Sequence, residues 1–343
     1  MTRAPQALQA AGGTAAQGIG LADPARRAHL AMRLAPGLTS LVYPALVWLV
    51  SSVSAFALLL TLVPLLASVV CIVRIGPSNR HPGAATVALL GVTAPALYSF
   101  MGGWLDGHKF LPLFLLPFRA DWLWALLWSM LIVLVAIERP RATAVPRKAK
   151  SSALAVAHGV SAAALTAFAI FHIGNHLTGL AGADAHIGVM DAMRMVYRHP
   201  FVEPLLLCAV LFQVLSGIAL LRRRVLTKNR FELAQTAAGA YLAVFFASHI
   251  SAVMRARYLR AVDTNWIWLT SSNLLTEPWS ARLVPYYFLA IVALGVHGAC
   301  GLRSVLRKHD RARVATIAFT MVAAGSVIVS LAVMIGLIRA SLR

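Results

Sequence analysis

Of the 343 residues, 59% are hydrophobic and only 12% are charged. A soluble globular domain cannot bury that much apolar surface, so the composition indicates an integral membrane protein with several spans. The formal net charge of +20 is divided among short basic clusters between apolar runs, which leaves no continuous basic face for a nucleic acid.

Apolar runs long enough to cross a bilayer recur along the chain. We predict an all-α integral membrane protein with about nine transmembrane helices, near 35–50, 55–73, 84–104, 120–137, 153–180, 201–221, 233–254, 283–302 and 314–338. Only the serine-rich stretch 51–54 separates the first two runs, so a count of eight spans stays open. The three cysteines stand alone in apolar runs and are expected to be small core residues: Cys71, Cys208 and Cys300.

The basic clusters predict the orientation of these helices. With nine helices, the clusters near 26–33, 74–80, 139–150, 222–230 and 303–313 all fall on one side. The positive-inside rule makes that side cytoplasmic, so we expect a cytoplasmic N-terminus and an external C-terminus. The first thirty residues lack the features of a secretory signal, and insertion through the first span is expected. The predicted location is a bacterial-type inner (cytoplasmic) membrane.

A long polar stretch in mid-chain, 138–152, divides the helices into two groups. We therefore expect a cytoplasmic N-terminal tail (1–34), an N-terminal membrane domain of about four helices (35–137), a cytoplasmic linker (138–152) and a five-helix domain (153–338).

The eleven histidines also fall into two groups. Six are expected in loops as solvated side chains: His29, His81, His108, His186, His199 and His309. Five fall within predicted spans of the C-terminal half: His158, His172, His176, His249 and His297. A polar group is costly in hydrocarbon and usually faces the interior of a helix bundle with a partner, so these five are the candidate site.

Helix geometry places the five histidines at two levels of the membrane. His158, His172 and His176 share one helix face, and His158 lies roughly 21 Å from His172 along the axis. The predicted topology puts His249 at the depth of His172 and His176, and His297 at the depth of His158. Facing imidazoles at matched depth are what b-type haem requires, because its iron takes one axial nitrogen from each side.

The same five histidines are also suited to interhelical hydrogen bonds or to a proton relay, although the spans contain almost no carboxylate. A zinc site is less attractive because no carboxylate or thiolate is expected at the same level. Arg255, Arg257 and Arg260 follow His249 and are candidates to pair with haem propionates, or alternatively to form a basic rim at the interface.

Residues 153–338 resemble the membrane-anchor cytochrome b subunit of succinate dehydrogenases and fumarate reductases, of the five-helix, dihaem type. The resemblance rests on "HGVSAAALTAFAIFHIGNHL", "FASHISAV" and "GVHGACG". It implies haem b, with His172 and His249 as outer ligands and His297 as one inner ligand. It also implies quinone or quinol as a partner, together with flavoprotein and iron–sulfur subunits.

The chain departs from that family on its second helix, where Gln213 stands roughly at the position of the inner histidine. Either the inner haem is absent or His158 supplies the missing nitrogen, so one or two haems are expected. His172 matches the family spacing better than His176, and both stay candidates. Asp184, Asp191 and Glu203 are candidates to accept a quinol proton.

The expected function is therefore that of a membrane-bound b-type cytochrome that transfers electrons to or from the quinone pool. Catalysis in the strict sense would belong to the complex. The alternative is a non-redox membrane transporter or assembly protein in which the histidines form a structural network.

Overall fold

The computed structural model describes residues 24–75, 80–105, 120–141, 153–222 and 229–343, and this part of the chain contains helices and no strand. The N-terminal group comprises α1 (Pro24–Leu41), α2 (Tyr43–Ser52), the 3-10 helix η1 (Ala55–Leu62), α3 (Val63–Arg74), α4 (Pro82–Val92), α5 (Ala94–Leu105) and α6 (Ala120–Ile137). The C-terminal group comprises α7 (Ala153–Thr178), α8 (Ala183–Tyr197), α9 (Val202–Arg222), α10 (Arg230–Arg260), α11 (Trp266–Thr270), α12 (Pro278–Ala281), α13 (Leu283–Lys308) and α14 (Ala312–Ser341). The predicted all-α class is confirmed.

Seven helical segments of the described residues are long and apolar enough to cross a bilayer, and two bent helix pairs raise the number to nine. The pair α1 and α2 bends by 49°, and the pair α4 and α5 bends by 70°. Pro44 and Pro95 lie in the first turns of α2 and α5, where a proline removes a hydrogen bond to the preceding helix. The break between the first two predicted spans falls at 53–54, inside the serine-rich stretch, so the first two runs form separate helices.

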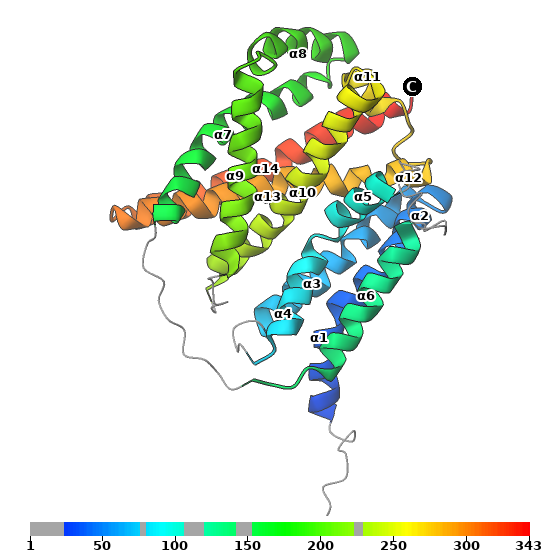
Figure 1. The fold of residues 1–343 in the computed structure, drawn as a ribbon, viewed down its shortest axis with the longest axis vertical. Coiled ribbons are helices and arrows are strands. Elements are labelled where there is room, and N and C mark those ends of the chain that lie inside the picture. Colours follow the sequence, from blue (N-terminus) through cyan, green and yellow to red (C-terminus); the bar gives the residue numbers. More distant parts are fainter. Residues whose placement is uncertain (1–23, 76–79, 106–119, 142–152, 223–228) are drawn as a thin grey trace, which may run out of the picture.

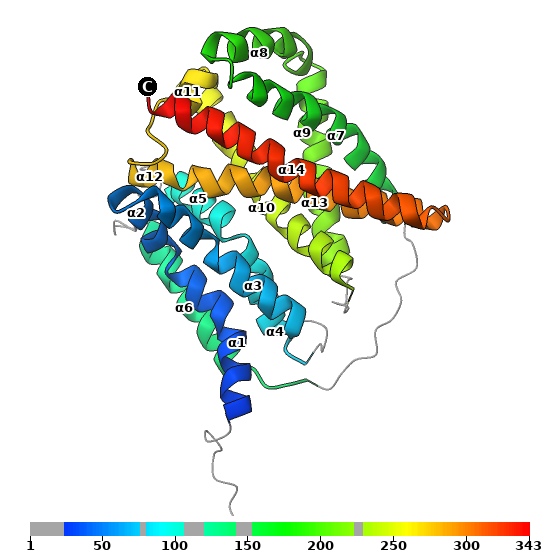
Figure 2. The ribbon, with the colours of Figure 1, turned by 180° about the vertical axis from the view of Figure 1, so that it is seen from behind.

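Figures 1 and 2 show the N-terminal helices α1–α6 beside the C-terminal group, with α10 and α13 between them and the outer helices α7, α9 and α14. The two groups share one apolar core, in which Cys71 and Ile72 of α3 pack with Tyr241 of α10 and Tyr286 of α13. Residues 142–152, most of the predicted linker, lie outside the described residues.

The ends of the helices fall on two sides in both views. The start of α1 and the ends of α3 and α9 lie at one side, whereas α8, α11 and the C-terminus lie at the other (Figures 1 and 2). This alternation agrees with the predicted grouping of the basic clusters. Which side is cytoplasmic stays a prediction.

Three predictions about positions away from the five candidate histidines were wrong. Residues 24–34, expected in the N-terminal tail, form the start of α1, and the Arg33 side chain is buried against the end of α6, where it donates to the carbonyl oxygen of Val135. His81 is buried at the start of α4 beside Glu138 and is not solvated. Cys208 is exposed on α9, because that helix turns this face away from the bundle, whereas Cys71 and Cys300 are buried as expected.

The C-terminal group is packed unevenly. Among the 26 residues of α7 only Asn175 is buried. In the most apolar stretch of this helix, no residue is buried. In the most apolar stretch of the α12–α13 span, by contrast, 44% of the residues are buried. Large apolar side chains such as Phe171, Leu205 and Met321 are exposed on α7, α9 and α14, as expected for a surface in contact with lipid.

Candidate functional site

The outer histidine pair joins α7 to α10. The rings of His172 and His249 have centroids 6.2 Å apart and planes at 63°. His172 stacks on Phe168, one turn earlier on α7, and His249 stacks on Phe245, one turn earlier on α10. Among the described residues, neither imidazole has a hydrogen-bond partner. The two rings therefore face each other at the same depth, as helix geometry predicts.

The inner pair joins α7 to α13, and its ring centroids are 6.3 Å apart with planes at 78°. The Ser216 hydroxyl donates to the carbonyl oxygen of Phe212 (2.6 Å), so it accepts from Nδ1 of His158 (2.8 Å). Nδ1 of His297 donates to the carbonyl oxygen of Gln235 (2.9 Å). Both rings therefore carry the proton on Nδ1, which makes Nε2 the nitrogen suited to a ligand, the usual arrangement of metal-bound histidine.

The centroid distances of the two pairs can be compared with those of imidazoles that share one metal. A metal–imidazole bond is about 2.0 Å and the ring centre lies about 1.2 Å beyond the nitrogen, so imidazoles on opposite sides of one metal have centroids about 6.4 Å apart. Two imidazoles joined directly by a hydrogen bond of about 2.9 Å have centroids about 5.3 Å apart. The distances of 6.2 and 6.3 Å match the first arrangement.

His176 belongs to a second network at the outer end of α7. Its Nδ1 lies 3.3 Å from Nε2 of His186, and the two ring centroids are 5.2 Å apart, as for directly hydrogen-bonded imidazoles. The side-chain amide of Asn175 donates to the same nitrogen of His186 (3.2 Å). The ring of Trp266 in α11 lies over the ring of His186, with the two ring centroids 4.5 Å apart. His172 therefore faces His249, whereas His176 faces His186.

The expectation that His186 is a solvated loop residue was wrong, because the side chain is 3% exposed. Residues 183–197 form α8, which folds back over the end of α7 after a turn at Gly182, whose φ of +124° favours glycine. The Trp266 ring lies so close to Gly179 that a Cβ there would be 2.2 Å from it. The apolar periodicity of 183–197 was the available signal, but it does not show what α8 packs against.

The remaining loop histidines divide in the same way. His199 and His309 are exposed at helix ends, as predicted, and His29 is exposed but lies on α1. His108 lies outside the described residues.

Two glycines and a glutamine lie next to the inner pair. A Cβ added at Gly239 of α10 would be 2.9 Å from Cε1 of His297, and one at Gly217 of α9 would be 3.5 Å from Cε1 of His158. The side-chain oxygen of Gln213, one turn before Gly217, is buried and has no partner among the described residues. Among all the described residues, no three or more metal-ligating side chains lie together in a way that could hold a metal ion. This finding argues against a zinc site and leaves a two-ligand site open.

Four of the arginines and carboxylates predicted near the outer site have protein partners: Arg255, Arg257, Glu203 and Asp191. Arg255 donates to the carbonyl oxygen of Gly103 (2.6 Å) and lies over the ring of Trp104. Arg257 forms a two-pronged ion pair with Glu203, which joins α10 to α9. The structure therefore offers no support for these arginines as propionate partners or for Glu203 as a proton acceptor. Asp191 pairs with Arg194 at 3.4 Å, and Asp184 is exposed.

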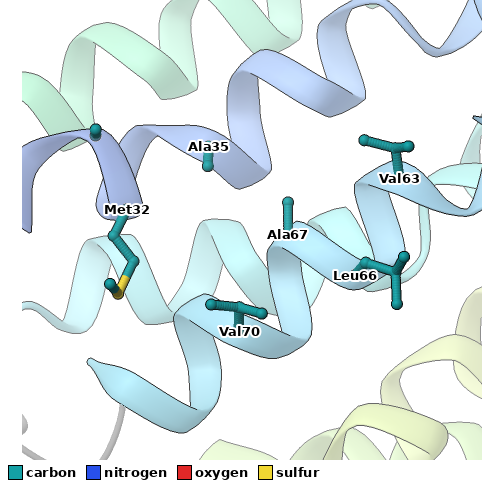
Figure 3. A pocket seen from close by; sticks show the side chains of 7 residues that line it. Met32, Ala35, Val63, Leu66, Ala67 and Val70 are labelled. Carbon is teal, nitrogen blue, oxygen red and sulfur yellow. The ribbon is translucent and has the colours of Figure 1, made fainter. Parts of the chain in front are cut away.

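An apolar groove of about 420 Å³ lies between α1 and α3 (Figure 3). It is lined by Ala31, Met32, Ala35, Val63, Leu66, Ala67 and Val70. The lining contains no titratable or hydrogen-bonding side chain, and it is formed by helices that carry none of the five candidate histidines. The groove is suited to a hydrocarbon chain and offers no chemistry.

Comparisons with known proteins found no matching family model, no matching curated protein and no matching solved structure. The function is therefore argued from the residues and their geometry.

Proposed function

We propose that this chain is a membrane-bound b-type cytochrome that holds haem b between histidines at two levels of the bilayer and exchanges electrons with the quinone pool. One observation carries the proposal. Helices α7, α10 and α13 bring together two pairs of imidazoles, with ring centroids 6.2 and 6.3 Å apart, where depth matching had left His172 and His176 as alternative partners of His249.

The protein would supply ligands, orientation and a dry environment. His172 and His249 would hold the outer iron, and His158 and His297 the inner iron. The hydroxyl of Ser216 and the carbonyl oxygen of Gln235 keep the Nε2 atoms of the inner pair unprotonated. The stacked phenyl rings of Phe168 and Phe245 fix the planes of the outer pair. Haem would supply reversible one-electron chemistry at each level.

The two levels would make an electron path across the bilayer. The fourteen residues from His158 to His172 correspond to a rise of roughly 21 Å along α7. Quinone, together with flavoprotein and iron–sulfur partner subunits, comes from the family resemblance of residues 153–338. The bacterial inner membrane is the location proposed with it.

A second candidate function is a non-redox transporter or assembly protein. The observation that favours it is the hydrogen-bonded group of Asn175, His176 and His186, which shows that some intramembrane histidines of this chain serve each other as partners. His172 and His249 do not follow that pattern.

The visible spectrum distinguishes the two functions. Protein purified from cells supplied with a haem precursor is expected to show a Soret band and, after dithionite reduction, an alpha band at the b-type position. The pyridine haemochrome assay is expected to give about two haems per chain. A sample without a Soret band would exclude the cytochrome and favour the histidine network.

A further inference from the structure

The apolar groove between α1 and α3 lies on the outside of the N-terminal helix group. Leu66 and Val70, which line it, are 60% and 50% exposed. Figure 3 shows the small side chains of Ala35 and Ala67 directed toward each other from the two helices. The depression therefore exists because alanines stand where larger side chains would fill the space, and its exposed apolar wall suits contact with lipid.

The length of the groove matches one leaflet of a bilayer. It runs along α3 from Val63 to Val70, and α3 continues for one more turn to Arg74. Eleven residues from Val63 to Arg74 rise by roughly 16 Å, and half of the hydrocarbon core is about 15 Å thick. A chain lying in the groove would therefore extend from the surface of the membrane to about its middle.

An arginine stands beyond the groove on each of its two helices. Arg27 precedes the lining residue Ala31 by one turn of α1, and Arg74 follows the lining residue Val70 by one turn of α3. Both arginines are exposed. The start of α1 and the end of α3 lie at the same side of the molecule (Figures 1 and 2). Residues one turn apart share a helix face, so both cations are placed at the same end of the groove.

This side of the N-terminal group has a large excess of positive charge. Among the described residues, its carboxylate is Glu138, which accepts from the backbone nitrogens of Gly83 and Ala84 and pairs with Arg33. Six exposed arginines lie at this side: Arg26, Arg27, Arg74, Arg80, Arg139 and Arg141. A basic cluster at the membrane end of an apolar groove is complementary to an anionic headgroup attached to a hydrocarbon chain.

We infer that the groove between α1 and α3 binds one anionic phospholipid, with an acyl chain along Ala35 and Ala67 and the phosphate between Arg27 and Arg74. Arginine suits a phosphate because its guanidinium presents several donors in one plane. A transmembrane helix of another protein would also fit against small residues, but it would not use the cations. The inference needs neither haem nor quinone, and it assigns a ligand to the N-terminal helices.

Native mass spectrometry of the full-length protein, released from detergent with dioleoylphosphatidylglycerol or dioleoylphosphatidylcholine, measures the binding. The two lipids have the same chains, and the wild type is expected to bind the anionic lipid at least about tenfold more tightly. Arg27→Gln and Arg74→Gln should each weaken phosphatidylglycerol binding about fivefold, since each basic residue near a membrane surface contributes about that factor. Neither should affect phosphatidylcholine. Arg313→Gln, at an exposed arginine in the first turn of α14, is the matched control.

A bulky side chain in the groove tests the place of the acyl chain. Ala67→Phe should weaken the binding of both lipids more than about tenfold, because the phenyl ring occupies the space of the chain. Ala136→Phe, at an exposed position of α6 outside the groove, should leave binding unchanged. If Ala67→Phe does not fold, Ala35→Leu takes its place.

Four results would overturn the inference. Equal retention of the two lipids by the wild type would show only the general lipid layer around a membrane protein. Unchanged phosphatidylglycerol binding in Ala67→Phe would place the chain elsewhere. Equally tight binding of dihexanoylphosphatidylglycerol, whose chains are too short for the groove, would leave a headgroup site alone. A lipid-free dimer that Ala67→Phe dissociates would make a second copy the occupant. None of these results depends on haem, so each leaves the proposed function standing.

Discussion

At the scale of single residues, the candidate histidines differ in their environments. His176 is bonded through Nδ1 to another imidazole, whereas His158 and His297 are bonded through Nδ1 to oxygen atoms. His172 and His249 are fixed by stacking alone. An imidazole without a polar partner is unfavourable inside a membrane, so His172 and His249 in particular are expected to bind a metal.

Replacing His249 by Ala should remove the outer haem. The variant loses one of the two imidazoles that would hold the outer haem, and the pyridine haemochrome ratio is expected to fall from about two to about one. His309→Ala is the matched control, because His309 is exposed at the end of α13. Equal haem content in the two variants would show that His249 is not a ligand. His186→Ala is unsuitable as the control, since His186 is buried against His176.

Gly239→Ala should disturb the inner site while every histidine is kept. The added methyl group would lie 2.9 Å from Cε1 of His297 and 3.0 Å from its Nδ1, so the ring has to move. We expect loss of about one haem per chain, or a shifted electron paramagnetic resonance signal of the inner site. In Gly298→Ala the methyl group enters open space beside the same histidine, and the spectrum should not change. An unaltered spectrum in Gly239→Ala would contradict the placement of His297.

At the scale of elements, polar contacts at the helix ends hold the spans in position. Glu138, at the end of α6, accepts from the backbone nitrogens of Gly83 (2.6 Å) and Ala84 (3.1 Å) at the start of α4. The same carboxylate lies 3.4 Å from the buried guanidinium of Arg33 on α1. One side chain thus joins α1, α4 and α6 at one side of the N-terminal domain.

Glu138→Ala should destabilise the N-terminal helices by about 3–5 kcal/mol, the usual effect of removing one partner from a buried ion pair. Glu138→Gln keeps one acceptor oxygen and should lose less. Thermal unfolding of the protein in detergent measures the effect as a lower midpoint, in the order wild type, Gln, Ala. An unchanged midpoint in the Ala variant would show that the contact between Glu138 and α4 does not support the fold.

Helix α8 is held over the outer histidines partly by an ion pair whose strength depends on pH. Arg194 of α8 lies 2.7 Å from Asp263, and this hydrogen bond lowers the pKa of the Asp263 carboxyl. A carboxyl whose pKa is lower in the folded state stabilises that state above its unfolded pKa of about 3.9, and the stabilisation is lost as the pH falls through the folded pKa. Asp263 is 53% exposed, so solvent screening limits the contribution to about 0.2–1 kcal/mol.

Asp263→Asn should therefore loosen α8 at neutral pH and have little effect at low pH. Hydrogen–deuterium exchange is expected to show protection of 183–197 reduced about two- to fivefold at about pH 7, with the difference disappearing near the folded pKa of Asp263. High salt should reduce the difference as well, because the pair is exposed. Asp310→Asn, an exposed position distant in the chain from α8, is the control. A difference that persists in acid would assign the effect to something other than the ion pair.

At the scale of the whole molecule, the tilted pair α13 and α14 and the long helix α10 bring histidines of distant segments to the same levels (Figure 1). His158 and His297 are 139 positions apart in the chain, yet their rings are 6.3 Å apart. The resemblance places the second inner ligand on the second helix of the bundle, where the structure has Ser216 bonded to His158.

The number of haems tests this arrangement. If His158 and His297 hold the inner iron, the ratio should fall from about two to about one both in His158→Ala and in His297→Ala. Ser216→Ala should retain the haem but weaken its binding roughly tenfold, since it loses a hydrogen bond to a ligand. A ratio of two that survives His158→Ala would place the missing ligand on α9. A wild-type ratio of one, unaffected by either substitution, would leave only the outer site.

The sequence by itself determined the helices and their approximate ends, and it predicted matched depths for His158 and His297 and for His249 and the His172/His176 pair. These properties follow from local rules, because apolar length is matched to the bilayer and each residue adds a constant rise and rotation. The sequence also located the break near 51–54, where short polar residues interrupt the apolar run.

Only the tertiary structure decided which side chains meet. The rotation and tilt of each helix against its neighbours are set by packing over many residues, and no local pattern encodes them. For that reason His186 could not be placed beside His176, nor could Arg257 be paired with Glu203.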